Sequence, residues 1–281
     1  MDHLLRGLAP IGEQGWREID AEAARTLRRT LAGRRLVDFS GPLGWDVSAV
    51  GRGRVRTIDA REGVRARLRE TQPLVEIDVP FRLARTEVDA IERGAKDADL
   101  GPVVQAARLA GLTEDRAIFA GFSSAGIAGI FERCSEQTLP LTDDYERYPK
   151  VVAAALTRLR NEGIEGPYAI ALGPRCYQGL TETTNKGGYP VINMVRQQLE
   201  DRIIWAPAVD GAVVLSLRGG DFELSIGQDF AVGYSHHDAE HVELFIRESM
   251  TFEVYTPEAA VPLKYDSASS AATQSPAPKT A

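Results

Sequence analysis

The residues of this sequence that could do chemistry by themselves are a serine near two glycines and a group of histidines. Gly121-Phe122-Ser123-Ser124-Ala125 approaches the G-x-S-x-G turn of a nucleophilic serine, but it lacks the last glycine and follows a helical pattern where a strand is required. His236, His237 and His241 include a pair that would share one face of a helix and could bind a metal ion. They lie between two strand-like runs, where an exposed turn is the simpler interpretation. A hydrolase or a metalloenzyme therefore stays open as an alternative.

Other common chemistries find no support in the sequence. It contains no G-x-x-x-x-G-K-[ST] loop and no G-x-G-x-x-G after a strand pattern, so both phosphate-binding fingerprints are missing. The two cysteines, Cys134 and Cys176, lie far apart, which excludes a disulfide framework or zinc knuckle and fits a reducing cytosol. With 33 Lys and Arg against 40 Asp and Glu, the net charge is -7, and no basic block favours nucleic-acid binding. We therefore expect a protein that works through its surfaces rather than by catalysis.

The elements that would position these residues follow from chain length and hydrophobic spacing. A chain of 281 residues, 43% of them hydrophobic, predicts about two domains with a substantial core. Apolar residues three or four apart predict an amphipathic helix over 13–31, and a second helix is predicted over 102–119. Strict alternation over 75–83 predicts a half-buried strand, in which Pro80 indicates a sheet edge.

The rest of the chain divides into segments of different character. Residues 46–72 are rich in glycine and arginine and predict a hairpin that reaches away from the body. Helical and strand patterns alternate from 146 to 199 around an unpatterned loop at 181–190, and strand patterns dominate after 203. The sequence starts without a signal-peptide pattern, and no apolar run is long enough to span a bilayer. We expect an α+β protein of the cytoplasm.

Several strings of the sequence, in order along the chain, resemble the shell proteins of the encapsulin family, also known as the linocin or bacteriocin type. They are LAPIGEQGWREID, LAGRRLVDFSGPLGW, IERGAKDADL, EGPY, IIWAPAVDGAVVLSLRGGDFELSIGQDFAVGY and SMTFEVYTPEA. Together they cover the chain from its first residues to about residue 264. Collinear matches of this length are far more specific than a short motif.

The resemblance implies an α+β fold like that of the major capsid proteins of tailed phages. A peripheral domain with an N-terminal helix and a spine helix would comprise residues 1–45, 73–134 and 221–264. Residues 46–72 would form an extended loop that reaches a neighbouring subunit, 135–220 an axial domain, and 265–281 a disordered tail that projects outward. The implied function is a non-catalytic, self-assembling shell subunit of an icosahedral bacterial nanocompartment. A prophage capsid protein of the same fold is a further alternative.

The resemblance also implies how a guest enzyme is held. Encapsulin shells bind the C-terminal targeting peptide of their guest, commonly a dye-decolourising-type peroxidase or a ferritin-like iron-storage protein, against the inner wall. Apolar side chains would receive the aliphatic residues of the peptide, while Arg34 and Asp38 would fix its orientation. The positions that resemble this pocket are Leu27, Leu31, Arg34, Asp38, Asp229, Phe230, Val232 and Tyr234. Plain core packing is the alternative role for the apolar members.

Two more expectations follow from the same resemblance. The loop that would line the pore on the fivefold axis is Glu182, Thr183, Thr184, Asn185, Lys186, Gly187 and Gly188, and the alternative is an exposed loop without gating. Some members stack a flavin on a tryptophan whose position is held here by Thr86. Because threonine has no aromatic face, we expect no flavin there, and we expect no other cofactor and no metal. The expected partners are copies of the chain and a guest enzyme, without nucleic acid or membrane.

Overall fold

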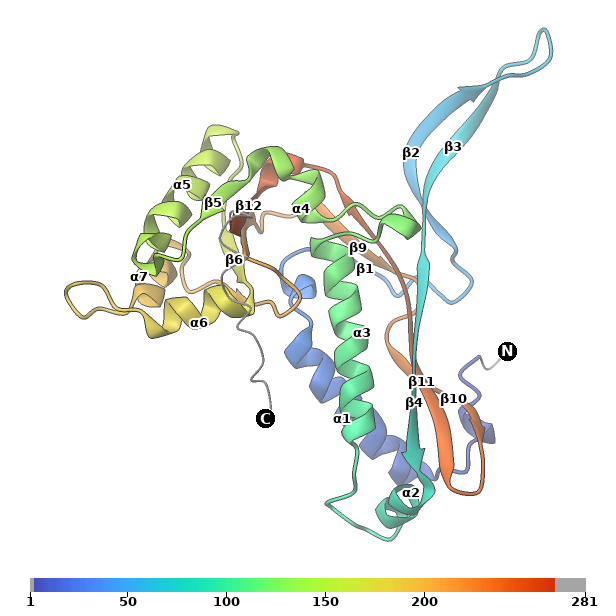
Figure 1. Ribbon diagram of the computed structural model, residues 1–281. Helices are drawn as coiled ribbons and strands as arrows, with labels where there is room; N and C mark the ends of the chain where they lie inside the picture. The colour runs from blue at the N-terminus through green and yellow to red at the C-terminus, as the bar shows by residue number, and fades with distance from the viewer. Residues whose placement is uncertain (1–2, 266–281) are drawn as a thin grey trace, which may run out of the picture. The chain divides into compact units, whose positions relative to one another are not determined.

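The computed structural model describes residues 3–265 (Figure 1). The chain divides into two compact units, and each is described here by itself. The first unit comprises residues 1–129 and 222–253, and the second comprises residues 130–221 together with the chain from 254 onward. The chain therefore leaves the first unit, builds most of the second, and returns to complete a sheet of the first.

The first unit contains a five-stranded sheet beside two long helices. Its strands are β1 (Asp38–Ser40), β9 (Phe222–Ile226), β11 (His241–Val254) and β10 (Ala231–His237) in that order, and β4 (Val75–Ala84) also pairs with β11. β11 is antiparallel to β4 and to β10, whereas β1 and β9 are parallel. Alternate residues of β4 are buried, including Ile77, Val79 and Phe81, as the alternation in the sequence predicts.

The two helices of this unit pack closely on each other. α1 (Glu13–Thr30) buries a stripe that includes Ile19, Ala23 and Leu27, whereas α3 (Gly101–Phe119) is buried on a broader face and also contacts β4. The close approach requires Gly111, because a Cβ there would lie 3.1 Å from the Cγ2 atom of Thr30. A short helix, α2 (Arg85–Glu92), follows β4, and single 3-10 turns span Arg6–Leu8, Gly33–Arg35 and Ser123–Ala125.

A two-stranded hairpin belongs to the same unit. It consists of β2 (Ala49–Ile58) and β3 (Ala66–Pro73), which pair only with each other in the described chain. Arg52 anchors its base, since its Nε donates to Glu253 at 2.6 Å and its Nη2 to the buried Gln72 at 2.5 Å. β2 is exposed from Gly51 to its end, so the hairpin has no core of its own.

The second unit is built on a mixed sheet in the order β5, β12, β8, β6, β7. These strands span Leu139–Leu141, Ala260–Tyr265, Ala212–Ser216, Tyr168–Leu172 and Ile203–Trp205. The helices are α4 (Ile130–Arg133), α5 (Tyr148–Asn161), α6 (Pro174–Glu182) and α7 (Val191–Gln198), with 3-10 turns at Ser135–Gln137, Tyr145–Arg147 and Pro257–Ala259. The central strand β8 is buried at every residue, and α5 packs against it and against α7.

The domain boundaries differ from the sequence-based prediction at two places. Residues 254–264 were assigned to the peripheral domain, but β12 lies in the second unit, where it pairs with β8 and β5. α4 likewise lies in the second unit rather than with the spine helix. A local sequence pattern identifies a strand, but the sheet that the strand joins depends on partner strands about 50 or more residues away. The predicted tail at 266–281 lies outside the described residues.

Candidate functional site

A groove of about 330 Å³ lies in the first unit between α1 and the start of β10. Its walls are mostly apolar and come from four elements that are distant in the sequence. The lining residues are Arg6, Asp20, Ala23, Ala24, Leu27, Phe230, Ala231, Val232 and Ile246. The groove exists because α1 presents small side chains at Ala23 and Ala24 where larger ones would fill the space.

The charged lining residues of the groove are paired with each other. The Nη2 atom of Arg6 lies 2.7 Å from the Oδ2 atom of Asp20, and the guanidinium of Arg6 also stacks 4.0 Å from the ring centroid of Trp16. This pairing ties the N-terminal 3-10 turn to α1. The groove is thus an apolar cleft bordered by a neutralised ion pair, and such a surface accepts aliphatic groups.

Arg34 lies beside the groove in a cluster of buried carboxylates. Its Nη2 atom lies 2.6 Å from Glu114, 2.6 Å from Glu248 and 2.8 Å from Asp229. Glu114 and Glu248 are fully buried, and burial of Arg34 opposes its charge, but the hydrogen bonds and attraction of these carboxylates raise the pKa of Arg34 above its usual value. The guanidinium is occupied by protein partners.

The cluster holds more acids than bases. Burial, followed by repulsion from Glu114, raises the pKa of Glu248 well above its usual value. Nearby, Asp115 accepts hydrogen bonds from the backbone amides of Ala32 and Gly33 at 2.8 and 2.9 Å, yet burial still raises its pKa to about 7. These contacts fix the chain after α1 against α3 and β11.

The structure separates the predicted peptide-site residues into two groups. Leu27, Phe230 and Val232 line the groove. The others do not line it: Leu31 is half-buried beyond the end of α1, Asp38 is exposed in β1, Asp229 pairs with Arg34, and the buried Tyr234 places its hydroxyl 2.6 Å from Nδ1 of His237.

Sequence analysis did not identify Arg6, Asp20, Ala23, Ala24, Ala231 or Ile246 as groove residues. The alanines on the apolar stripe of α1 could have indicated the groove, because small side chains on a buried face leave space for another molecule. Arg6 and Asp20 are 14 residues apart, and no local pattern connects them.

The residues of the enzyme alternatives are not assembled into a site. Ser123 is exposed in a 3-10 turn preceded by α3 rather than by a strand. His236 and His237 end β10, His241 begins β11, and Asp238 caps the turn between them by accepting from two backbone amides at 2.7 Å. Within residues 3–265, no group of three or more metal-binding side chains is gathered. The histidines therefore lie at the strand ends on either side of a hairpin turn.

Of the predicted pore loop, Glu182 is the last residue of α6, and the rest follows this helix in the second unit and is organised around one side chain. Asn185 accepts hydrogen bonds from the backbone amides of Gly187 and Tyr189, both at 2.9 Å, through its Oδ1 atom. Its own backbone amide donates to the carbonyl of Tyr189, and Gly188 adopts a φ of +77°. Lys186 and the two glycines are exposed.

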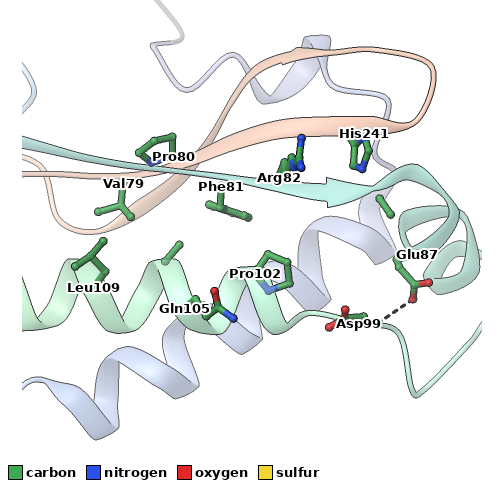
Figure 2. Close-up of a pocket in the computed structure, with 12 residues that line it drawn as sticks. Val79, Pro80, Phe81, Arg82, Glu87, Asp99, Pro102, Gln105, Leu109 and His241 are labelled. Atoms are coloured by element: carbon green, nitrogen blue, oxygen red, sulfur yellow. Dashed lines mark hydrogen bonds between the residues drawn. The ribbon is translucent and has the colours of Figure 1, made fainter. Parts of the chain in front are cut away.

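A second groove of the first unit, about 520 Å³, lies between β4 and α3 (Figure 2). Val79, Phe81 and Leu109 contribute apolar walls, and Glu87 accepts from the backbone amide of Asp99 at 2.9 Å at one end. Thr86 lies exposed in the first turn of α2 next to this groove but does not line it. Phe81 supplies the aromatic ring of the lining, so a planar cofactor would have one stacking surface.

Comparison with known proteins decides what kind of chain this is. The family described as "Encapsulating protein for peroxidase" matches residues 1–251. The type 1 encapsulin shell protein of Rhodospirillum rubrum is 51% identical over 271 residues, covering 94% of this chain and 97% of the relative. The chain belongs to the encapsulin shell protein family. The type 1 encapsulin shell protein of Mycobacterium tuberculosis is 46% identical, and the match covers 94% of this chain and 100% of the relative.

Solved structures agree on the fold. A virus-like particle from Pyrococcus furiosus has a TM-score of 0.62 at 16% identity, covering 88% of this chain and 98% of that one. The capsid of Myoviridae phage XM1 has a TM-score of 0.52 at 9% identity, with coverage of 84% and 90%. The fold is thus the phage-capsid fold, and this encapsulin is a shell protein rather than an enzyme. None of its described helices is both long and apolar enough to cross a membrane.

Proposed function

We propose that this chain assembles with copies of itself into a closed icosahedral shell in the cytoplasm and encloses an enzyme that carries a C-terminal targeting peptide. The groove between α1 and β10 carries the second part of the proposal. Most of its lining residues are apolar, its two charged residues are already paired, and its size suits aliphatic side chains. Family membership supports the first part.

The exposed hairpin supports self-assembly. Val55 is 52% exposed, Val64 61% and Leu68 49%, although such residues are normally buried. Leu68 pairs with Arg56, and Ala66 pairs with Ile58, so Ile58, Ala66 and Leu68 share one face of the hairpin with Arg56, whereas Val55 pairs with Arg69 on the other face. A second copy of the chain would cover this face and complete the open strand edges.

The assembly proposal is tested by two neighbouring substitutions that introduce the same charge on opposite faces. Ile58→Asp places a carboxylate on the apolar face and is expected to prevent particle formation, while Thr57→Asp on the other face leaves it intact. Size-exclusion chromatography and negative-stain microscopy distinguish the two. Hollow particles from both variants, or a wild type that stays monomeric, would contradict the proposal.

The groove proposal is tested with two alanines of α1. Ala24 lines the groove, whereas Ala21 is exposed on the same helix. Ala24→Phe is expected to fill the groove and reduce co-purification of the guest at least tenfold, and Ala21→Phe serves as the matched control. Equal loading by the two shells would show that the peptide binds elsewhere.

The guest is proposed to be a dye-decolourising-type peroxidase or a ferritin-like iron-storage protein. The description of the matching family, which names peroxidase, favours the first. Mass spectrometry of shells purified from the native host would identify the guest. A guest of another class would overturn this part of the proposal and leave the shell function intact.

We propose that the loop from Glu182 to Gly188 lines a pore through which ions and small substrates pass, and that no flavin binds beside Thr86. The exposed Lys186 and Glu182 would set the charge of the opening. Flavin absorbance in shells purified from cells supplied with riboflavin would contradict the proposal that no flavin binds beside Thr86. A Lys186→Glu shell with unchanged uptake of anionic substrate would contradict the proposal that this loop lines the pore.

A further inference from the structure

We propose that Tyr265, Tyr148 and Cys176, called here the tyrosine–cysteine cluster, form a one-electron oxidation site that carries the oxidising equivalent of a small radical to the sulfur of Cys176. The substrate is a small one-electron oxidant, and dioxygen is the co-reactant that makes the oxidation of the sulfur permanent. This inference concerns the second unit and goes beyond shell formation and guest binding.

The cluster joins three elements of the second unit that are distant in the sequence. Tyr148 begins α5, Cys176 lies in α6 and Tyr265 ends β12. The hydroxyls of Tyr148 and Tyr265 lie 2.6 Å apart, which is typical of a good O–H···O hydrogen bond. The Sγ atom of Cys176 lies 3.2 Å from the Tyr148 hydroxyl and 3.3 Å from the Tyr265 hydroxyl. Two phenols and a thiol thus form one hydrogen-bonded group.

The packing of the unit holds these groups in place. The ring of Tyr145 stacks on that of Tyr148, with centroids 5.2 Å apart and an angle of 28° between the planes. On its other side Tyr145 packs against Gly179 of α6, where a Cβ atom would collide with the ring. Glycine is unfavourable inside a helix, and the space that this ring requires explains its presence there. The distances within the cluster are therefore fixed by close packing.

Burial keeps the groups of the cluster protonated. Cys176 is 0% exposed and Tyr148 1%, and desolvation raises the pKa of the Cys176 thiol and of the Tyr148 and Tyr265 hydroxyls. Peroxides attack thiolates rather than thiols, so Cys176 is a poor target for two-electron oxidation. A neutral phenol is oxidised more readily when its proton leaves together with the electron. The cluster is therefore suited to the transfer of hydrogen atoms.

Tyr265 is the point of entry for the oxidant. It is half-buried, and the guanidinium of Arg175 lies 3.9 Å from the centroid of its ring. A cation over an aromatic ring opposes positive charge on that ring. Loss of an electron alone is therefore disfavoured, and the neutral phenoxyl radical is the product at this position.

The reaction transfers one hydrogen atom at each step. The oxidant takes an electron from Tyr265, whose hydroxyl proton leaves at the same time, and a phenoxyl radical remains. Tyr148 then gives its hydroxyl hydrogen to the Tyr265 oxygen, and Cys176 gives its thiol hydrogen to the Tyr148 oxygen. Both phenols are restored, and the unpaired electron lies on the Cys176 sulfur. Dioxygen adds to this sulfur and forms a sulfur–oxygen bond.

The direct test exposes assembled shells to azide radicals, generated by radiolysis in buffer that contains dioxygen. An azide radical takes one electron from tyrosine and becomes azide, while the phenol proton passes to the buffer. The shells are then unfolded and alkylated with iodoacetamide, which does not modify a sulfur that has gained oxygen. By mass spectrometry we expect at least threefold greater loss of free thiol at Cys176 than at Cys134, which is also buried and unpaired. Equal losses at the two cysteines would overturn the proposal.

Two tyrosine variants test the path. Tyr265→Phe removes the entry hydroxyl and keeps the ring, and it is expected to reduce the loss at Cys176 to that at Cys134. Tyr168→Phe is the matched control, because Tyr168 is also half-buried beneath an arginine but donates its hydroxyl to the carbonyl of Ile164 at 2.7 Å. An unchanged loss in Tyr265→Phe shells, or the same reduction in both variants, would contradict the path. If Tyr265→Phe does not form shells, Tyr148→Phe interrupts the path one step later and has the same expected result.

Hydrogen peroxide distinguishes this path from direct oxidation of the thiol. Peroxide needs no tyrosine but requires an accessible thiolate. We therefore expect peroxide to leave Cys176 open to alkylation after unfolding, whereas azide radicals do not. If peroxide oxidises Cys176 as completely as azide radicals do, the cysteine reacts directly and the proposed relay is refuted.

Discussion

Arg34 forms ion pairs with three carboxylates, two of which are fully buried. Glu114 and Glu248 can remain buried because the guanidinium lies 2.6 Å from each. Replacing a whole buried ion cluster by apolar residues is often tolerated, but removing one partner leaves an uncompensated charge. The position expected to orient the guest peptide therefore has a second, structural role.

We predict that Arg34→Met destabilises the subunit by about 3–5 kcal/mol. The measurement is the shift in thermal or urea unfolding of the variant shell compared with the wild type. Arg35→Met, at the exposed neighbouring position, is the control and should shift the transition by less than about 1 kcal/mol. If Arg34→Met changed peptide binding alone, its role in the buried cluster would be refuted.

Asp115 makes stability depend on pH in a direction that is unusual for a carboxylate. Its pKa is 3.8 as a free side chain and about 7 in the fold, because burial disfavours the charged form. The folded state therefore binds this proton more tightly, so its contribution to stability is complete below about pH 4 and is lost as the pH rises through 7.

We predict that Asp115→Asn lowers stability overall but flattens its pH dependence between pH 4 and 7. Asparagine keeps one of the two backbone hydrogen bonds and cannot ionise. Ile118→Val, a neighbouring change without a titratable group, should lower stability and keep the wild-type slope. Identical slopes in all three proteins would show that Asp115 is not the titrating group.

At the scale of elements, the loop after α6 depends on Asn185. Its side-chain oxygen accepts from two backbone amides within the loop, those of Gly187 and Tyr189. Asn185→Ala is predicted to accelerate amide exchange at Gly187 and Tyr189 about fivefold, since each lost hydrogen bond is worth roughly 1 kcal/mol. Lys186→Ala in the same loop is the control. Unchanged exchange in the Asn185 variant would show that the backbone alone maintains the turn.

The elements were largely predictable from the sequence, but their partners were not. The spacing of Ile19, Ala23 and Leu27 predicts α1, and the alternation through Phe81 predicts β4, because both patterns are local. The pairing of Arg34 with Glu248 spans 214 residues and has no local signature. The same limit explains why the sequence missed the structural role of Arg34 and why it missed Arg6.

At the scale of the whole molecule, the two units are built from different segments of the chain and contain different candidate sites. Residues 130–221 form most of the second unit as an insertion between α3 and β9, and β12 returns to it after β11. The first unit contains the groove, the buried ion cluster and the hairpin, and the second contains the loop around Asn185. The proposed sites for guest capture and for passage of small molecules thus lie in different units, and we expect that separate mutations can alter them.

We expect the hairpin also to determine how sensitive an unassembled subunit is to proteases. Its exposed strands and connecting turn contain Arg52, Arg54, Arg56, Arg61, Arg65, Arg67 and Arg69, each a cleavage point for a trypsin-like protease. Trypsin is expected to cut dissociated subunits within residues 52–69 and to leave assembled particles intact, as electrophoresis and mass spectrometry would show. We expect the same difference to act as quality control in the cell, where unassembled copies would be degraded and assembled copies would survive.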